Sequence, residues 1–205
     1  MYTPRKFAFR ANVDWLDDVA ANPLCAMVSI VDSECIVSHI PVAIITEGGN
    51  RIAIGHVARD NPHWHHWSPD GPTTKLIFTN LNAYVSPKSY QDAIQVPTWN
   101  YVAVHLSGHP TYVEYDHEPG LLHGIMDALI DAFEPDYFSV WQVLSQDVQE
   151  KFLRGIIGFR MPIDNVECVE KMSQNRTERD AIAIAAVLDA RGGSDVAHRV
   201  LGVRQ

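Results

Sequence analysis

The feature that most constrains the fold is a series of short β-rich runs separated by turn signals. The first two runs are Leu24–Val31 and Cys35–Thr46, and Asp32-Ser33-Glu34 joins them. Aspartate and serine favour such tight connections because their side chains hydrogen-bond to the nearby backbone. A third run, Arg51–Val57, follows the glycine-containing segment Thr46–Asn50. Runs joined in this way predict antiparallel strands in consecutive hairpins.

Further β-rich runs follow later in the chain. They are Thr74–Thr79, Thr98–Tyr115 and Ile156–Val169. The second of these is interrupted by Ser107-Gly108-His109-Pro110, which predicts another hairpin. An irregular loop over about 86–97 precedes it. Six or more strands in this order favour an antiparallel barrel over a doubly wound sheet.

The helical segments are added around these strands and do not alternate with them. Asn61-Pro62 predicts a short helix that carries His63–Trp67, because asparagine caps helices and proline suits their first turn. Longer segments with helical apolar spacing are Asn12–Ala21, Glu118–Phe133, Gln146–Arg154 and Thr177–Ala190. We therefore predict a β-rich α+β fold, an antiparallel barrel with peripheral helices. It forms one domain over residues 1–205, with a C-terminal helical segment from about residue 177.

Charge limits the kinds of partner. The 205 residues carry a formal net charge of −9, and no run of lysine or arginine could follow a phosphate backbone. Direct DNA binding is therefore not supported by charge, and no helix-turn-helix motif supports it either. A ligand with a phosphate group would need a few positioned cations and backbone N–H groups.

The cysteines and the hydropathy indicate the compartment. Cys25, Cys35 and Cys168 are odd in number and have no C-x-x-C spacing, which argues against a disulfide framework or a zinc ribbon. No apolar stretch approaches the roughly 18 residues that span a bilayer. We expect reduced thiols in a cytoplasmic protein that does not enter a membrane.

One segment could hold a phosphate group. Gly55–Pro62 ends a strand with Arg59 and opens a helix, whose free N–H groups attract anions. The alternative is that Arg59 is a surface residue paired with Asp60 or with a glutamate. The local pattern leaves these two interpretations open.

A second group concentrates histidines. His56, His63, His65 and His66 lie within eleven residues, and imidazoles are common metal ligands. No carboxylate or thiolate completes a ligand set. We therefore favour a helix with solvated or partner-facing aromatic side chains, and we predict no metal.

Two polar segments and one Ser-His pair complete the candidates. Val96–Tyr101 either packs in the core and at a subunit contact or surrounds a ligand. In Lys171–Arg176, either Asn175 caps the last helix or the segment reaches a ligand. Ser38-His39 lacks a nucleophile elbow and a third triad member, so no catalytic residue is nominated.

Six motifs, taken together, resemble the PaiB family. They occur in family order from residue 1 to about residue 180 and are Met1–Pro4 with Phe7, Ser38–Pro41, Gly55–Arg59 with Asn61-Pro62 and Trp64, Ala83–Pro87, Val96–Tyr101 and Lys171–Arg176. The resemblance implies a split β-barrel akin to that of pyridoxamine-phosphate oxidase. In such barrels two subunits pair and FMN lies in the groove between them.

The resemblance also implies the residues that bind FMN. His56, Val57, Ala58 and Arg59 match the turn that grips the phosphate. Ser38 and His39 lie on a neighbouring strand near the ring or the phosphate, and Thr98, Trp99 and Asn100 contact either the flavin or the partner subunit. Lys171, Asn175 and Arg176 close the site.

Two departures from the family pattern bear on the cofactor. The segment Ser86–Tyr90 lacks the tryptophan expected before the tyrosine, which removes an aromatic contact near Lys88-Ser89. Before Lys171 this chain has Val169-Glu170, where the family usually has a glycine or lysine followed by an aromatic residue. The added negative charge predicts weaker flavin affinity than in relatives.

The family is described as FMN-binding negative regulators of transcription, with effects on degradative enzymes and sporulation. Without a DNA-binding motif, such regulation would act through ligand or redox state and a protein partner. An alternative is an FMN-dependent oxidoreductase of the pyridoxamine-phosphate-oxidase-like type. Haem is a third, less favoured ligand, because none of the ten histidines is marked as an axial ligand.

Overall fold

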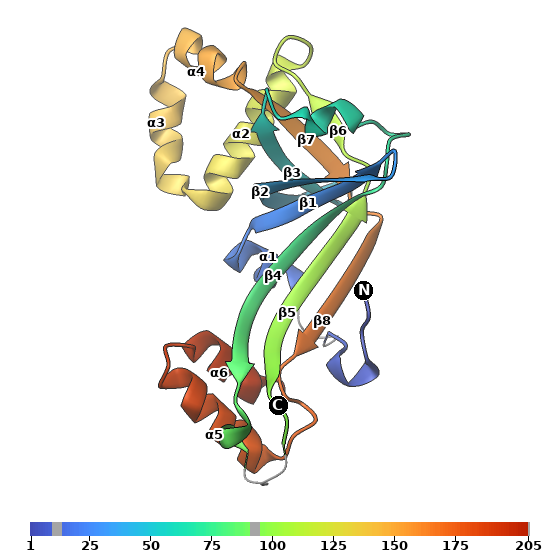
Figure 1. The fold of residues 1–205 in the computed structure, drawn as a ribbon. Helices are drawn as coiled ribbons and strands as arrows, with labels where there is room; N and C mark the ends of the chain where they lie inside the picture. Colours follow the sequence, from blue (N-terminus) through green and yellow to red (C-terminus); the bar gives the residue numbers. More distant parts are fainter. Residues whose placement is uncertain (10–13, 91–94, 205) are drawn as a thin grey trace. The chain divides into compact units, whose positions relative to one another are not determined.

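The computed structural model describes residues 1–9, 14–90 and 95–204. Eight strands follow the hydrogen-bonded order β6-β7-β3-β2-β1-β4-β5-β8 (Figure 1). The chain divides into two compact units. Unit 1 consists of Met1–Asn22, Phe78–His105 and Glu167–Gln205, and unit 2 consists of Pro23–Ile77 and Leu106–Val166. Strands β4 (Thr74–Val85) and β5 (Thr98–Gly108) contribute residues to both units. The expectation of one domain stays a prediction.

The first three strands form the predicted antiparallel meander in unit 2. They are β1 (Leu24–Val31), β2 (Glu34–Glu47) and β3 (Asn50–Ala58). Asp32 and Ser33 have φ of 49° and 71° in the first turn, and Gly48 and Gly49 have φ of 55° and 84° in the second. Two successive positive φ angles give a turn whose twist matches that of the flanking strands.

The predicted hairpin at residues 107–110 is wrong. Strand β6 (Thr111–Val113) pairs with β7 (Ile156–Pro162), with Tyr112 opposite Phe159. Proline at position 110 cannot donate to a ladder, and a Cβ at Gly108 would lie 2.1 Å from the carbonyl oxygen of Pro162. The backbone of β5 therefore passes too close to β7 for any side chain at position 108.

Helices cover one side of the unit 2 strands. They are α2 (Pro119–Phe133), α3 (Phe138–Val143) and α4 (Gln146–Leu153), with a 3-10 turn η4 (Pro135–Tyr137) between the first two (Figure 1). The sequence predicted α2 and α4 but not α3. Leu122 and Ile125 of α2 pack in one core with Ile54 of β3. A Cβ at Gly158 would lie 2.6 Å from Leu122 Cδ1, so this glycine lets α2 approach β7.

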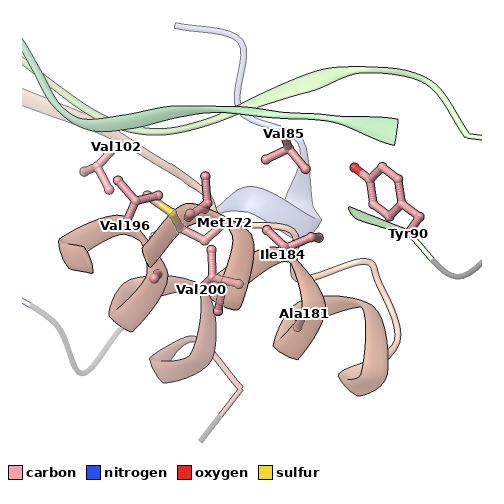
Figure 2. Close-up of a cluster of buried hydrophobic side chains, with 11 residues drawn as sticks. Val85, Tyr90, Val102, Met172, Ala181, Ile184, Val196 and Val200 are labelled. Atoms are coloured by element: carbon pink, nitrogen blue, oxygen red, sulfur yellow. The ribbon is translucent and has the colours of Figure 1, made fainter. Parts of the chain in front are cut away.

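Unit 1 has its own core between strands and C-terminal helices. Its remaining elements are η1 (Arg5–Phe7), α1 (Trp15–Ala21), η3 (Pro87–Ser89), β8 (Asn165–Lys171), α5 (Glu178–Asp189) and α6 (Ser194–Gly202). Figure 2 shows Ile184 of α5 and Val200 of α6 beside Met172, below the strands that carry Val85 and Val102. The predicted start of the first helix at Asn12 lies outside the described residues. The sequence did not predict α6.

Two properties of the described ranges concern a membrane and a metal ion. No helix there combines the length and the apolar character needed to cross a membrane. No group of three or more histidine, cysteine or acidic side chains there could hold a metal ion.

Candidate functional site

Arg59 lies in the turn after β3 and is held by three hydrogen bonds in unit 2. Its backbone N–H donates to the Gly155 carbonyl at 3.0 Å. Its Nε donates to the Arg154 carbonyl at 2.6 Å, and its Nη1 donates to Glu114 Oε1 at 2.8 Å. The remaining Nη2 is buried and has no partner among the described residues. The guanidinium is therefore fixed in orientation and keeps one unsatisfied donor.

The helix that follows is a short 3-10 helix, η2 (Pro62–His66). Asn61 caps it, and its side-chain oxygen accepts from the backbone N–H of His63 at 3.0 Å. The cap occupies a backbone N–H group that the sequence pattern had left free for an anion. The positive charge at this turn therefore comes from Arg59, whose carbonyl also accepts from Trp64 Nε1 at 2.9 Å.

Ser38 lies in a buried hydrogen-bond network that supports the same turn. Its hydroxyl lies 3.0 Å from His63 Nδ1 and accepts from the Asn61 amide at 3.0 Å. His63 Nε2 lies 2.8 Å from the Ser29 hydroxyl, which lies 2.7 Å from that of Thr74. Burial lowers the pKa of His63, so its imidazole is neutral at neutral pH.

The other predicted residues of unit 2 point in different directions. His39 is exposed on β2 beside the buried Ser38, because neighbouring side chains alternate between the faces of a strand. On β3, Val57 is buried and Ala58 is exposed. His56 lines a pocket under the helices together with Trp141, and its Nδ1 is buried without a partner among the described residues.

A second cluster of predicted residues lies in unit 1. Lys171 Nζ donates to the Thr98 hydroxyl at 2.6 Å, and the rings of Phe7 and Tyr101 lie 5.9 Å and 6.0 Å from the same Nζ. Burial, and then the charge of Lys6, lower the pKa of Lys171. The ammonium group is thus bonded to a neutral oxygen in a partly apolar environment.

Asn100 extends this cluster on β5. It is fully buried, and its Oδ1 accepts from the Ser173 hydroxyl at 3.0 Å. Ser173 has φ of 60°, a left-handed conformation that turns the chain between β8 and α5. The Nδ2 of Asn100 is buried and has no partner in the described part of the chain. It is a second unsatisfied donor.

The last predicted residues of unit 1 are less enclosed. Trp99 is 54% exposed and its ring lies 6.0 Å from that of Tyr84. Arg176 Nη1 donates to Gln95 Oε1 at 2.6 Å, and its guanidinium lies 4.4 Å from the centre of the Tyr90 ring. Asn175 is exposed and does not cap α5. Thr177 is the cap, since its hydroxyl accepts from the backbone N–H of residue 180 at 3.1 Å.

Sequence reasoning missed two residues that shape the Arg59 turn. Glu114 is the glutamate that pairs with Arg59, but it lies 55 residues away in the chain. His63 was assigned to an aromatic helix, whereas it is fully buried and links two strands to the turn. The capping pattern at Asn61 was the one local signal that pointed to this turn.

Comparison with known proteins identifies the family. Residues 1–165 match the family model described as "Putative FMN-binding domain". The chain belongs to this FMN-binding family. A Bacillus subtilis (strain 168) relative, "Protease synthase and sporulation protein PAI 2", is 29% identical over 182 residues, which cover 88% of this chain and 85% of the relative. Both findings confirm the resemblance that the motifs indicated.

Solved structures show the fold of this FMN-binding family member. The flavocytochrome Anf3 from Azotobacter vinelandii matches with a TM-score of 0.60 at 15% identity, over 83% of this chain and 73% of that chain. The FAD and heme binding protein from Mycobacterium smegmatis matches with a TM-score of 0.56 at 17% identity, over 87% and 77%. These likenesses confirm the predicted antiparallel split barrel with peripheral helices.

Membership of this family confirms FMN as the predicted cofactor, and two groups in the structure fit it. The unsatisfied Nη2 of Arg59 suits a phosphate oxygen, and the unsatisfied Nδ2 of Asn100 suits a carbonyl oxygen. Lys171, Asn175 and Arg176 lie beyond the residues that the family model matches. The roles of the individual residues in FMN binding stay predictions.

Proposed function

We propose that the chain is a PaiB-like negative regulator of transcription that acts as a homodimer with FMN at the subunit interface. The observation that carries the proposal is the Arg59 guanidinium, which is anchored on two nitrogens and keeps a buried donor without a partner among the described residues. In a member of an FMN-binding family, an oriented cation of this kind suits the FMN phosphate.

The charge balance around Arg59 offsets part of the attraction for the FMN phosphate. Glu114 neutralises part of the guanidinium charge at 2.8 Å, and this carboxylate would repel a dianion nearby. The phosphate would therefore rely on the geometry of the Nη2 donor more than on net attraction. This agrees with the formal net charge of −9, which also repels anions.

The unit 1 cluster, taken by itself, has two groups that suit a flavin ring. Lys171 is bonded to the neutral Thr98 hydroxyl rather than to a carboxylate, so its charge is available to an electron-rich ring edge. Asn100 offers an N–H group from a fully buried position. Bound FMN would supply a group whose charge and shape depend on redox state, while these residues orient it.

Regulation would act through a protein partner. The net charge and the lack of a DNA-binding motif in the sequence disfavour base readout. The name of the Bacillus subtilis relative, which refers to protease synthesis and sporulation, supports a regulatory role over a purely metabolic one.

The test of the phosphate contact compares FMN with riboflavin, which lacks the phosphate. We expect Arg59→Ala to weaken FMN binding by roughly 10- to 150-fold, the range for a hydrogen bond to a charged group. Riboflavin binding should stay within about twofold. Titrations that follow flavin fluorescence measure both constants.

Glu114→Gln is the matched control, because it removes the ion pair but keeps the guanidinium. It should leave FMN affinity unchanged or raise it, because the glutamine amide oxygen can still accept from Arg59 Nη1 and hold the guanidinium. If Arg59→Ala and Glu114→Gln weaken FMN and riboflavin equally, Arg59 is only structural and the phosphate assignment fails.

Light scattering with and without FMN measures whether the chain is a dimer, and a monomer at saturating FMN would refute the interface site.

The oxidoreductase alternative is tested with the same preparation. Multiple turnovers of NADH by the FMN-loaded protein would favour an enzyme over a regulator. Binding to promoter DNA that weakens steeply with salt would instead contradict regulation through a protein partner.

A further inference from the structure

A pocket of 320 Å³ lies between the helices of unit 2 and its sheet. Its walls come from β3, α2, η4, α3, α4 and β7, and they are His56, Met126, Ile130, Tyr137, Trp141, Phe152, Leu153 and Ile156. This volume lies at the lower end of the range for small-molecule sites.

The lining residues define the chemistry of that occupant. None of them carries a carboxylate, an ammonium or a guanidinium group, and three of them are aromatic side chains of Tyr137, Trp141 and Phe152. Such walls bind flat apolar molecules through contact area and ring packing. A charged ligand would lose its hydration there without gaining a charged partner.

His56 is the imidazole within these walls. Its Nδ1 is buried without a hydrogen-bond partner among the described residues, which is rare for a polar atom of a folded protein. Burial lowers the pKa of His56, so the ring is neutral near pH 7 and offers one donor and one acceptor. A neutral imidazole selects a neutral hydrogen-bonding group rather than an anion.

Two aromatic residues of the lining also reach solvent. Phe152 is 57% exposed and Tyr137 is 37% exposed. An apolar ligand in the pocket would remove part of this aromatic surface from water.

We propose that this pocket, the α2–α4 pocket, binds a small neutral aromatic molecule of about two fused rings with one hydroxyl or amide-type group directed at His56. The site is additional to FMN binding and does not rest on the proposed function. It also gives His56 a role other than contact with the FMN phosphate.

The test titrates the full chain with 2-naphthol, and with naphthalene as the matched probe without a hydroxyl group. We expect 2-naphthol to bind at one molecule per chain and to quench the fluorescence of the tryptophans, one of which, Trp141, lines the pocket. His56→Phe should weaken 2-naphthol binding by roughly 2- to 12-fold, the range for one neutral hydrogen bond. Binding of naphthalene to this variant should not weaken.

Two further variants separate the pocket from the protein surface. Ile130→Trp fills the pocket and should reduce 2-naphthol affinity at least tenfold, while FMN affinity and the circular dichroism spectrum stay unchanged. Val143→Ser is the surface control, because Val143 lies on α3 outside the lining and is 81% exposed. It should bind 2-naphthol like the wild type.

Four outcomes would overturn the proposal. They are no saturable binding of 2-naphthol, equal binding by wild type and Ile130→Trp, equal loss in Val143→Ser, and competition between 2-naphthol and FMN. The last would make the pocket a part of the flavin site. Reduced self-association of Ile130→Trp without 2-naphthol binding would assign the pocket to a second copy of the chain, which also contradicts a small-molecule site.

Discussion

Replacing His63 with leucine tests whether the buried network holds the Arg59 turn. The substitution removes two hydrogen bonds, to the Ser38 hydroxyl at 3.0 Å and to the Ser29 hydroxyl at 2.8 Å. Each serine keeps another partner, Asn61 for Ser38 and Thr74 for Ser29, so neither is left unsatisfied. The expected loss is therefore two neutral bonds at about 1 kcal/mol each, about 2 kcal/mol in total.

The ring contact with Trp67, whose centre lies 5.7 Å from that of His63, adds up to about 1 kcal/mol to the loss. Urea unfolding followed by circular dichroism measures the change in the free energy of unfolding. His39→Ala is the control, because its exposed side chain should contribute less than about 0.5 kcal/mol. A loss below 0.5 kcal/mol for His63→Leu would refute the network as a support of the turn.

Three other predictions concern pH, packing and thiols. Burial lowers the pKa of His63, so the unfolded chain binds more protons than the folded chain in acid. The free energy of unfolding should therefore be full above about pH 6.5 and should fall as the pH drops through the folded-state pKa. Urea unfolding midpoints at about pH 7.5 and about pH 5 measure this loss. Gly108→Ala places a Cβ 2.1 Å from a β7 carbonyl oxygen and should lower the free energy of unfolding by about 2–3 kcal/mol. Gly120→Ala on α2 meets nothing within 4 Å and should raise it by roughly 0.5–1 kcal/mol. Thermal unfolding measures both changes. Burial raises the pKa of Cys25 to about 12, whereas Cys35 is exposed. A chromogenic disulfide reagent should therefore modify Cys35 in the folded protein and Cys25 only on unfolding. Rapid reaction of both thiols in the folded protein would contradict the burial of Cys25.

Local signals were enough to predict most elements of the fold. The β1 bounds Leu24–Val31 agree with the predicted run, because turn residues flank an alternating apolar pattern. The partner of β6 was not predictable in this way, since the close approach at Gly108 depends on β7, about fifty residues later. Helix α3 was missed because its six residues are too few for a clear apolar period.

The candidate site was predictable as a set of motifs but not as a set of contacts. The family motifs placed Arg59 at a turn after a strand, and the structure confirms that position. Its partner Glu114 and the burial of His63 depend on contacts between distant segments, which local patterns do not encode. His56 was grouped with Arg59 by sequence, whereas alternation along β3 directs it into the α2–α4 pocket.

In the proposed FMN site, the anchoring of Arg59 would affect how the chain discriminates among ligands. A free arginine side chain gives up about 2 kcal/mol of rotamer entropy when it is immobilised. Here Glu114 and the Arg154 carbonyl already immobilise it, so a phosphate oxygen would meet a preorganised donor and would not bear that entropic cost. Lysine at position 59 would keep the charge but lose this rigidity, which makes Arg59→Lys a substantial change despite its conservative appearance. In the proposed site, position 59 would contribute rigidity more than charge to selectivity.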